Sequence, residues 1–290
     1  MTVLVPISLE QAVAGLAANP GATLLAGGTD LLVEVNEGHR TFPWPEGDAA
    51  VISLTRVPEL TTWAFDPQRR RVTLGAAITW SLIEREPLRG MLPALAEAAR
   101  TVGSPQIRNA GTVGGNLATC SPAGDGLPVF AALDALVQLV GPGGRRTLPV
   151  ADFMLGVKRT ALTPDEIIES VTLPVLEGWQ GYSKVGVRNA MVIATASACL
   201  ATDRAARSVR IALGSVAPTI VRAPEAEAFA LGAVDWEASA VADDAVARFG
   251  ELAAAASRPI DDHRSTAAYR HHAIAVMAAR LLRRAFPNQT

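Results

Sequence analysis

Two glycine-rich segments in the N-terminal half constrain this 290-residue chain more than any other feature of its sequence. Leu25–Leu31 reads Leu-Ala-Gly-Gly-Thr-Asp-Leu, and Gly111–Thr119 reads Gly-Thr-Val-Gly-Gly-Asn-Leu-Ala-Thr. Glycine allows positive φ angles and lets backbone N–H groups come close to an anion, while a threonine hydroxyl adds a neutral donor. The two segments therefore predict a cradle for a pyrophosphate.

Neither glycine-rich segment matches a standard nucleotide-binding fingerprint. The chain contains no Gly-Lys-Ser or Gly-Lys-Thr, which a P-loop requires, and neither segment reads Gly-x-Gly-x-x-Gly. Both nucleotide hydrolysis and a Rossmann NAD site are therefore disfavoured. An ordinary tight turn accounts equally well for either segment taken alone. Two such turns in one lobe favour a cofactor site.

The order of apolar and turn-forming residues predicts an α+β chain. Ala22–Ala26 is a short apolar run bounded by glycines, so the first glycine pair is expected in a strand-to-helix turn. Residues 101–116, rich in Gly, Ser, Pro and Asn, predict a long irregular loop, and such loops are usually functional. Residues 39–48 contain two prolines and a glycine and predict a further loop.

The C-terminal third has a different pattern from the rest of the chain. Proline and glycine between residues 174 and 181 predict a domain boundary. Three antiparallel strands and two alanine-rich helices are expected after it, at residues 181–187, 193–201, 208–214, 241–256 and 267–286. We therefore expect three units, at residues 1–54, 55–176 and 177–290.

Charge and cysteine content exclude several classes of function. A formal net charge of −2 gives no electrostatic attraction to nucleic acid or to an anionic membrane. We found neither a signal sequence nor an apolar stretch long enough to cross a bilayer, so a cytoplasmic protein without membrane insertion is expected. Cys120 and Cys199 are the only cysteines and form no Cys-x-x-Cys pair, so this chain is expected to hold no metal and no iron–sulfur cluster.

Three further residues near the glycine-rich segments are candidates for the site. Asp125 either caps the helix that follows it or accepts hydrogen bonds from a ribityl or ribose hydroxyl. Lys184, one of only two lysines, is either solvated or lies near a flavin ring on its predicted strand. Cys120 raises the question of a covalent flavin link, but a buried, unreactive thiol is the simpler interpretation.

Several of these segments, taken in order, carry a family resemblance. They are Leu25–Leu31, Ile107–Asn116, Ser121–Asp125, Glu166–Ile168 with Leu173–Pro174, Tyr182–Arg188, Gly214–Thr219 and Pro259–Arg264. Together they resemble the FAD-binding medium subunit of the molybdenum hydroxylases, the family of carbon monoxide dehydrogenase and xanthine dehydrogenase. The resemblance covers essentially the whole chain.

The resemblance implies a fold and a set of cofactor-binding residues. The fold would be two lobes enclosing one non-covalent FAD, like vanillyl-alcohol oxidase, followed by a domain with a three-stranded antiparallel sheet and helices. The implied FAD-binding residues are Leu24, Leu25, Ala26, Gly27, Gly28, Thr29, Asp30, Leu31, Val102, Gly111, Thr112, Val113, Gly114, Gly115, Asn116, Asp125, Ile168 and Lys184. Residues 24–31 and 112–116 would hold the diphosphate and ribityl chain. Asp125 would bind in that region, and Val102, Ile168 and Lys184 near the adenine or flavin ring.

The resemblance also implies partners. An iron–sulfur small subunit would carry two [2Fe–2S] clusters, and a molybdopterin large subunit would carry molybdenum and hydroxylate the substrate. The whole would form a dimer of heterotrimers. This chain would then be an electron-transfer subunit with no catalytic acid or base of its own. The sequence leaves two alternative functions open: a stand-alone FAD-dependent oxidase and a non-catalytic nucleotide-binding scaffold.

Overall fold

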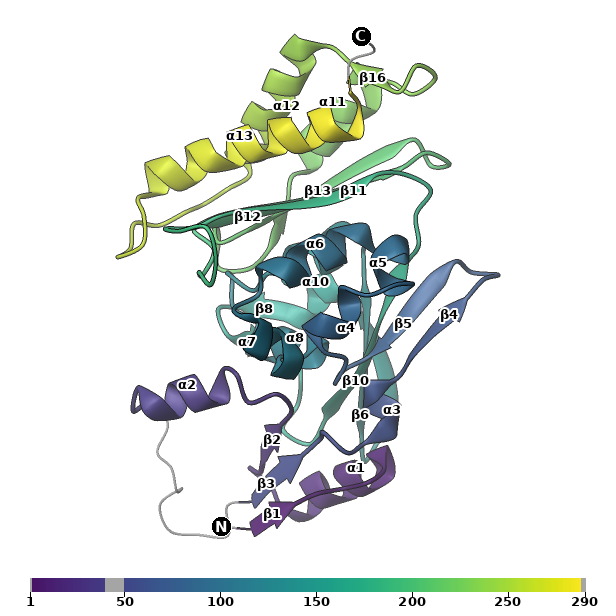
Figure 1. The fold of residues 1–290 in the computed structure, drawn as a ribbon, viewed down its shortest axis with the longest axis vertical. Coiled ribbons are helices and arrows are strands. Elements are labelled where there is room, and N and C mark those ends of the chain that lie inside the picture. The colour runs from purple at the N-terminus through teal and green to yellow at the C-terminus, as the bar shows by residue number, and fades with distance from the viewer. Residues whose placement is uncertain (1, 40–49, 288–290) are drawn as a thin grey trace.

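The three largest β-sheets follow one another along the longest axis of the molecule (Figure 1). The computed structural model describes residues 2–39 and 50–287, so most of the loop expected at residues 39–48 lies outside the described residues. The sheets belong to an N-terminal lobe, a middle lobe and a C-terminal domain. A two-lobed α+β fold followed by a sheet-and-helix domain is therefore confirmed.

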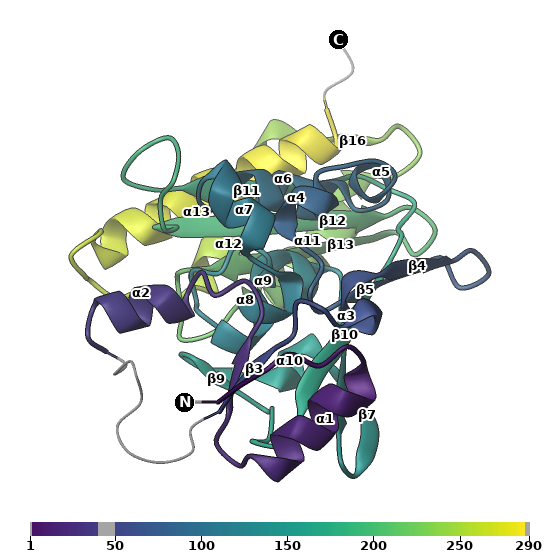
Figure 2. The same ribbon diagram turned by 60° about the horizontal axis from the view of Figure 1, so that its bottom comes forward.

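The N-terminal lobe is a parallel three-stranded sheet with the order β1-β3-β2. Its strands are β1 (Thr2–Leu4), β2 (Thr23–Leu25) and β3 (Ala50–Ser53), and its helices are α1 (Leu9–Ala18) and α2 (Leu31–Asn36). The first glycine pair lies between β2 and α2, as the sequence predicts. α2 projects from the body of the lobe in both views (Figure 1, Figure 2).

The middle lobe is an antiparallel five-stranded sheet with the order β4-β5-β10-β6-β7. Its strands are β4 (Trp63–Asp66), β5 (Arg71–Gly75), β6 (Leu136–Gly141), β7 (Gly144–Pro149) and β10 (Ile167–Pro174). Its helices are α3 (Pro58–Thr61), which precedes β4, α4 (Trp80–Ile83), α5 (Leu88–Met91), α6 (Pro93–Thr101), α7 (Pro105–Ala110), α8 (Val113–Thr119), α9 (Leu127–Ala132) and α10 (Val150–Phe153). A small hairpin, β8 (Met154–Gly156) and β9 (Arg159–Thr160), follows α10, and Lys158 in its turn reaches Glu34 of α2 at 3.0 Å.

The prediction of a long irregular loop at residues 101–116 is wrong, because the short helices α7 and α8 occupy most of this stretch. Ser104 accepts a hydrogen bond from the backbone N–H of Ile107 at 3.3 Å and so caps α7, whose first residue is a proline. Thr112 caps α8 in the same way, accepting from the N–H of Gly115 at 3.0 Å. Two hydroxyl caps thus allow helix in a stretch whose Gly, Ser, Pro and Asn content predicts none.

The main sheet of the C-terminal domain contains the three expected antiparallel strands and one more. The sheet order is β11-β12-β13-β14, and the extra strand β14 is only two residues long. The elements are β11 (Gln180–Val185), β12 (Ala196–Asp203), β13 (Ser208–Gly214), β14 (Val221–Arg222), α11 (Pro224–Ala233), β15 (Val234–Asp235), β16 (Ala240–Val241), α12 (Asp243–Ala255) and α13 (Ala267–Ala285). Such a short strand at a sheet edge carries almost no periodic signal, so the sequence did not predict it.

Both faces of this C-terminal sheet are buried. Ala198 and Leu200 of β12 belong to the core beneath α11, α12 and α13, which cover one face (Figure 1). Cys199 and Ala201, which alternate with them, belong to the core of the two N-terminal lobes. The sheet therefore joins the domain to the lobes through a continuous apolar contact.

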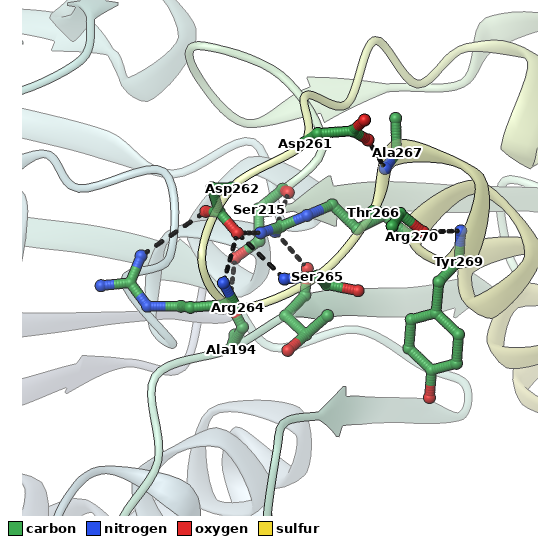
Figure 3. A network of polar contacts seen from close by, with 11 residues as sticks. Ala194, Ser215, Asp261, Asp262, Arg264, Ser265, Thr266, Ala267, Tyr269 and Arg270 are labelled. Atoms are coloured by element: carbon green, nitrogen blue, oxygen red, sulfur yellow. Dashed lines mark hydrogen bonds and ion pairs between the residues drawn. The ribbon is translucent and has the colours of Figure 1, made fainter.

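A buried arginine ties together three segments of the C-terminal domain (Figure 3). Arg270 of α13 is 4% exposed and donates from Nη1 to the carbonyl oxygens of Thr195 and Ser215 at 2.6 and 3.0 Å. Its Nη2 donates to Asp262 Oδ1 at 2.6 Å. Because Thr195 precedes β12 and Ser215 follows β13, one side chain holds the ends of two strands against the loop before α13.

The Asp262 carboxylate is stabilised in its ionised form by this network. Burial raises the pKa of Asp262, but hydrogen bonds from the backbone of Arg264, from Arg270 and from the backbone of Ser265 outweigh it and bring the pKa to about 2. Since this pKa is lower than in the unfolded chain, the carboxylate contributes stability above about pH 4 and loses it as the pH falls through about 2.

Replacement of the buried arginine should destabilise the C-terminal domain. Arg270→Met removes the buried donor to the Thr195 and Ser215 carbonyl oxygens and the cation paired with Asp262, so we expect the free energy of unfolding to fall by about 3 kcal/mol. Urea titration followed by circular dichroism measures this. Arg248→Met is the control, because Arg248 is 57% exposed and forms an exposed ion pair with Glu251, and its loss should stay below about 0.5 kcal/mol. Equal losses in the two variants would contradict the role given to Arg270.

Candidate cofactor-binding site

One cavity of about 650 Å³ collects almost all the residues that the sequence predicts for the site. Of the predicted set, every residue but Val113 and Lys184 lines it. Val113 is fully buried in the core of the lobes and does not reach the cavity. Lys184 does not line the cavity, but its Nζ donates to Asp125, which does. The volume is within the range typical of cofactor sites.

The two glycine-rich segments pack directly against each other at this cavity. A Cβ built on Gly27 would lie 1.9 Å from the carbonyl oxygen of Ala110, a distance that no side chain tolerates. Thr119, at the end of α8, donates its hydroxyl hydrogen to Asp30 Oδ2 at 2.7 Å. Gly114 is similarly confined, since its Cβ would lie 2.6 Å from the Cβ of Ala76. Gly27 and Gly114 are therefore required for backbone packing as well as for ligand access.

The free backbone donors come from the first segment. Among the described residues, no acceptor is bonded to the N–H groups of Gly27, Gly28 and Thr29. Gly28 has φ +69°, a left-handed conformation that glycine adopts without strain. Three unpaired donors beside a strand-to-helix turn match the oxygens of a phosphate.

In the second segment, the N–H groups of Val113, Gly114 and Gly115 already have acceptors in the protein. Val113 donates to Ile78 O at 2.9 Å, Gly114 to Ala76 O at 2.7 Å, and Gly115 to the Thr112 hydroxyl at 3.0 Å. This segment instead contributes an orphaned acceptor, because Asn116 Oδ1 is buried without a hydrogen-bond partner among the described residues. A hydroxyl group of a ribityl or ribose chain would satisfy it.

Asp125 is held on the cavity wall by two residues of β11. Its Oδ1 accepts from the Tyr182 hydroxyl and its Oδ2 from Lys184 Nζ, both at 2.8 Å. Burial raises the pKa of Asp125 above its usual value, and the Lys184 ammonium and the two hydrogen bonds limit the rise. Burial and the neighbouring carboxylate both raise the pKa of Tyr182. The phenol therefore stays protonated and donates a hydrogen bond to Asp125.

Several cavity residues were missed by sequence analysis. Trp80 of α4 and Ser104 line the wall, and Met191, Val192 and Ile193 reach it from the loop between β11 and β12. A cap serine and a run of apolar residues in a loop carry no signal that points to a distant cavity. Only the docking of the C-terminal sheet brings the 191–193 segment to the site.

Neither cysteine is suited to bond a flavin covalently. Cys120 is 2% exposed and its Sγ lies 3.8 Å from Gly156 O, while Cys199 is fully buried in the sheet. Burial raises the pKa of both thiols. Both groups therefore stay protonated, which agrees with the interpretation of Cys120 as an unreactive buried thiol.

Together, these groups fit FAD. Unpaired N–H donors at Gly27 to Thr29 suit the diphosphate, and the orphaned Asn116 Oδ1 suits a hydroxyl of the chain that joins it to the ring. Val102, Ile168 and Ile193 supply apolar surface for aromatic rings. The arrangement defines a two-lobed flavoprotein with a third domain docked on its cofactor site.

Comparisons with known proteins identify the family. Residues 1–176 match the family described as the FAD binding domain in molybdopterin dehydrogenase, and residues 182–285 match the CO dehydrogenase flavoprotein C-terminal domain. The chain belongs to the family of FAD-binding medium subunits of molybdenum-dependent dehydrogenases, so the resemblance predicted from the sequence is confirmed. It is the flavin subunit of an oxidoreductase.

Individual relatives extend over nearly the full chain. The carbon monoxide dehydrogenase medium chain of Hydrogenophaga pseudoflava is 33% identical over 288 residues, which is 97% of this chain and 93% of that protein. The nicotine 6-hydroxylase medium subunit of Paenarthrobacter nicotinovorans is 32% identical over 269 residues, which is 92% of this chain and 90% of that protein. A solved structure of the H. pseudoflava carbon monoxide dehydrogenase that lacks the Mo-pyranopterin moiety has a TM-score of 0.86, covering 98% of this chain and 96% of that one at 33% identity.

Two absences complete the description of residues 2–39 and 50–287. No helix in these residues combines the length and the hydropathy that a transmembrane span requires. No group of three or more His, Cys, Asp or Glu side chains in the same residues could hold a metal ion.

Valine at either of two cradle glycines should abolish FAD retention. Gly28→Val forces a β-branched residue to φ +69°, and Gly115→Val places a Cβ 2.9 Å from the Thr112 hydroxyl that caps α8. The FAD-to-protein ratio from absorbance of the purified variants measures the loss. Gly143→Val is the control, since no atom lies within 4 Å of its Cβ. Stoichiometric FAD in both folded cradle variants would show that the cradle lies elsewhere.

Loss of Lys184 should be rescued by loss of the Asp125 charge. Lys184→Met leaves a buried, unpaired carboxylate, so the free energy of unfolding should fall by about 3 kcal/mol at pH 7. Because the pKa of Asp125 is then higher in the folded than in the unfolded chain, the deficit should shrink as the pH is lowered and the carboxyl takes up a proton. Denaturant titrations of Lys184→Met and of the Asp125→Asn/Lys184→Met double variant at pH 5 and pH 7 test both statements. An undiminished deficit in the double variant would contradict the pairing.

Proposed function

We propose that this chain is the electron-transfer subunit of a molybdenum-containing dehydrogenase, and that its FAD receives electrons from [2Fe–2S] clusters on a partner subunit and passes them to an external acceptor. The observation that carries the proposal is the cavity, in which unpaired N–H groups, an orphaned Asn116 oxygen and an apolar wall meet. When bound there, FAD supplies reversible two-electron chemistry with one-electron steps.

The chain's own residues would bind and orient the cofactor. Residues 24–31 would hold the diphosphate through free N–H groups, and residues 111–116 would hold the ribityl chain, chiefly through the Asn116 side chain. Asp125 would accept a hydrogen bond from the cofactor while Lys184 balances its charge. Val102 and Ile168 would exclude water from the rings. None of these roles moves a substrate proton.

We further propose partners and a location. Curated relatives are named as medium chains or medium subunits, which supports assembly with a small iron–sulfur subunit and a large molybdopterin subunit, as a dimer of heterotrimers in the cytoplasm. The names of these relatives refer to carbon monoxide and to nicotine. Relatives with similar medium subunits are thus named for very different molecules. This supports a substrate site on another chain of the complex. The proposed units of this chain remain residues 1–54, 55–176 and 177–290.

A stand-alone oxidase is the weaker alternative, because it needs an acid or base free to act on a substrate. Two carboxylates line the cavity, and both accept hydrogen bonds within the protein: Asp125 from Tyr182 and Lys184, and Asp30 from the Thr119 hydroxyl. Tyr182 is only 5% exposed, and its pKa is raised well above its usual value. A non-catalytic scaffold would not require a cavity that fits a redox cofactor.

Anaerobic reduction distinguishes the three functions. Expressed alone, the chain should be yellow with one FAD per protein and should hydroxylate no substrate. In the complete complex, a substrate of the molybdenum subunit should bleach the flavin, whereas the isolated subunit should bleach at least about 100-fold more slowly, because it lacks the cluster relay. Stopped-flow absorbance at the flavin band measures both rates. Equal rates would favour the oxidase, and a colourless folded chain that takes up no FAD would favour the scaffold.

A further inference from the structure

Helix α6 packs against β11 where the middle lobe meets the C-terminal domain (Figure 1). In the described part of the chain, β11 is an edge strand, because it pairs with β12 and has no strand on its other side. Every second N–H group of an edge strand points away from the neighbouring strand and needs another acceptor when it is buried. The N–H of the buried Tyr182 finds this acceptor in a side chain of α6.

Hydrogen bonds from Tyr182 and Lys184 join β11 to α6, and their spacings match. The Glu97 carboxylate accepts from the Tyr182 N–H at 2.7 Å, and the Thr101 carbonyl oxygen accepts from Lys184 Nζ at 3.1 Å. Four residues of helix rise about 6 Å and two residues of strand about 6.8 Å, so the helix and the strand stay in step over this distance. The four residues therefore fix β11 at one register along α6.

This register sets two parts of the cofactor cavity. Val102, the residue that follows α6, lines the cavity, and so does Asp125. Tyr182 and Lys184 donate to the two oxygens of Asp125, both at 2.8 Å. A shift of β11 along α6 would therefore draw both donors away from a carboxylate whose side chain is only 9% exposed.

Glu97 itself does not line the cavity, and it contacts two neighbours. Its side chain is 38% exposed, and the oxygen that Tyr182 does not use accepts from Arg284 Nη2 of α13 at 2.9 Å. The Arg284 guanidinium also lies 5.0 Å from the centre of the Trp179 ring, next to the start of β11. Because the two contacts of Glu97 use different oxygens, each can be removed separately.

We propose that Glu97 is a positioning residue of the FAD site and acts through the backbone of Tyr182. By accepting the edge N–H, its carboxylate holds β11 at the register in which Tyr182 and Lys184 keep Asp125 against the cavity. A carboxylate suits this task, because a hydrogen bond to a charged acceptor is shorter and stronger than one to a neutral acceptor. The inference rests on the FAD site of the proposed function, but not on the source of the electrons.

Titration of the deflavinated full-length chain with FAD, followed by flavin fluorescence, tests this role. Glu97→Ala should raise the dissociation constant for FAD by at least about tenfold, as expected for the loss of one hydrogen bond to a charged group. Glu97→Gln should stay within about threefold of the wild type, because its amide oxygen still accepts from Tyr182. The visible circular dichroism of the bound flavin should change in Glu97→Ala and be restored in Glu97→Gln.

Two control variants separate positioning from domain docking. Arg284→Met removes the ion pair with Glu97 but leaves the contact with Tyr182, and Glu251→Ala makes the same substitution on α12, where Glu251 is 66% exposed. Both should bind FAD within about threefold of the wild type and keep its flavin dichroism. If Glu97→Ala does not fold, Glu97→Asp replaces it, since it keeps the charge and withdraws the oxygens by one carbon. It should weaken FAD binding by at least about threefold.

Three results would overturn the positioning role. Glu97→Ala could bind FAD as tightly as the wild type with unchanged flavin dichroism, or Arg284→Met could weaken binding as much as Glu97→Ala, which would indicate domain docking alone. A folded wild type that takes up no FAD would overturn both this role and the proposed function. Failure of the electron relay alone leaves the measured affinities unchanged, because the titration contains no partner subunit.

Discussion

The contact between the backbone of Gly27 and the carbonyl group of Ala110 is the constraint on which the cofactor site depends. It brings the strand-to-helix turn of the N-terminal lobe against the residues that precede α8 in the middle lobe, closer than any Cβ permits. Gly114 makes a comparable approach to Ala76 on the opposite side of its own segment. With both contacts in place, the N–H groups of residues 27–29 and the side chain of Asn116 face one cavity. Cofactor chemistry and lobe packing therefore depend on the same glycines.

The C-terminal domain completes this site rather than standing beside it. β11 supplies Tyr182 and Lys184 to Asp125, and the backbone N–H of Tyr182 donates to Glu97 of α6 at 2.7 Å. The loop after β11 adds Met191 to the lining of the cavity. The cofactor cavity is therefore lined by residues of all three structural units.

Much of the fold was predictable because its signals are local. The apolar run before Gly27, the apolar run that forms β12 and the alanine-rich stripe of α13 each depend on residues within a few positions of one another. The helices at residues 105–110 and 113–119 were missed because their caps, Ser104 and Thr112, outweigh a composition that is typical of loops. For the site, motif residues were predictable, whereas Trp80 and Met191 were not, since neither belongs to a glycine-rich pattern.

By itself, the sequence determined which groups could bind a flavin nucleotide: two glycine pairs with hydroxyl neighbours, one aspartate after them, and one of the two lysines on a later strand. It could not determine what each glycine does, because the atoms that exclude a side chain at Gly27 and Gly114 lie on distant segments. Only the tertiary structure decided that Gly27 to Thr29 present three adjacent free N–H groups and that Lys184 is paired with Asp125. The physical reason is that hydrogen-bond satisfaction, burial and charge balance are properties of neighbours in space, which the order of residues along the chain does not specify.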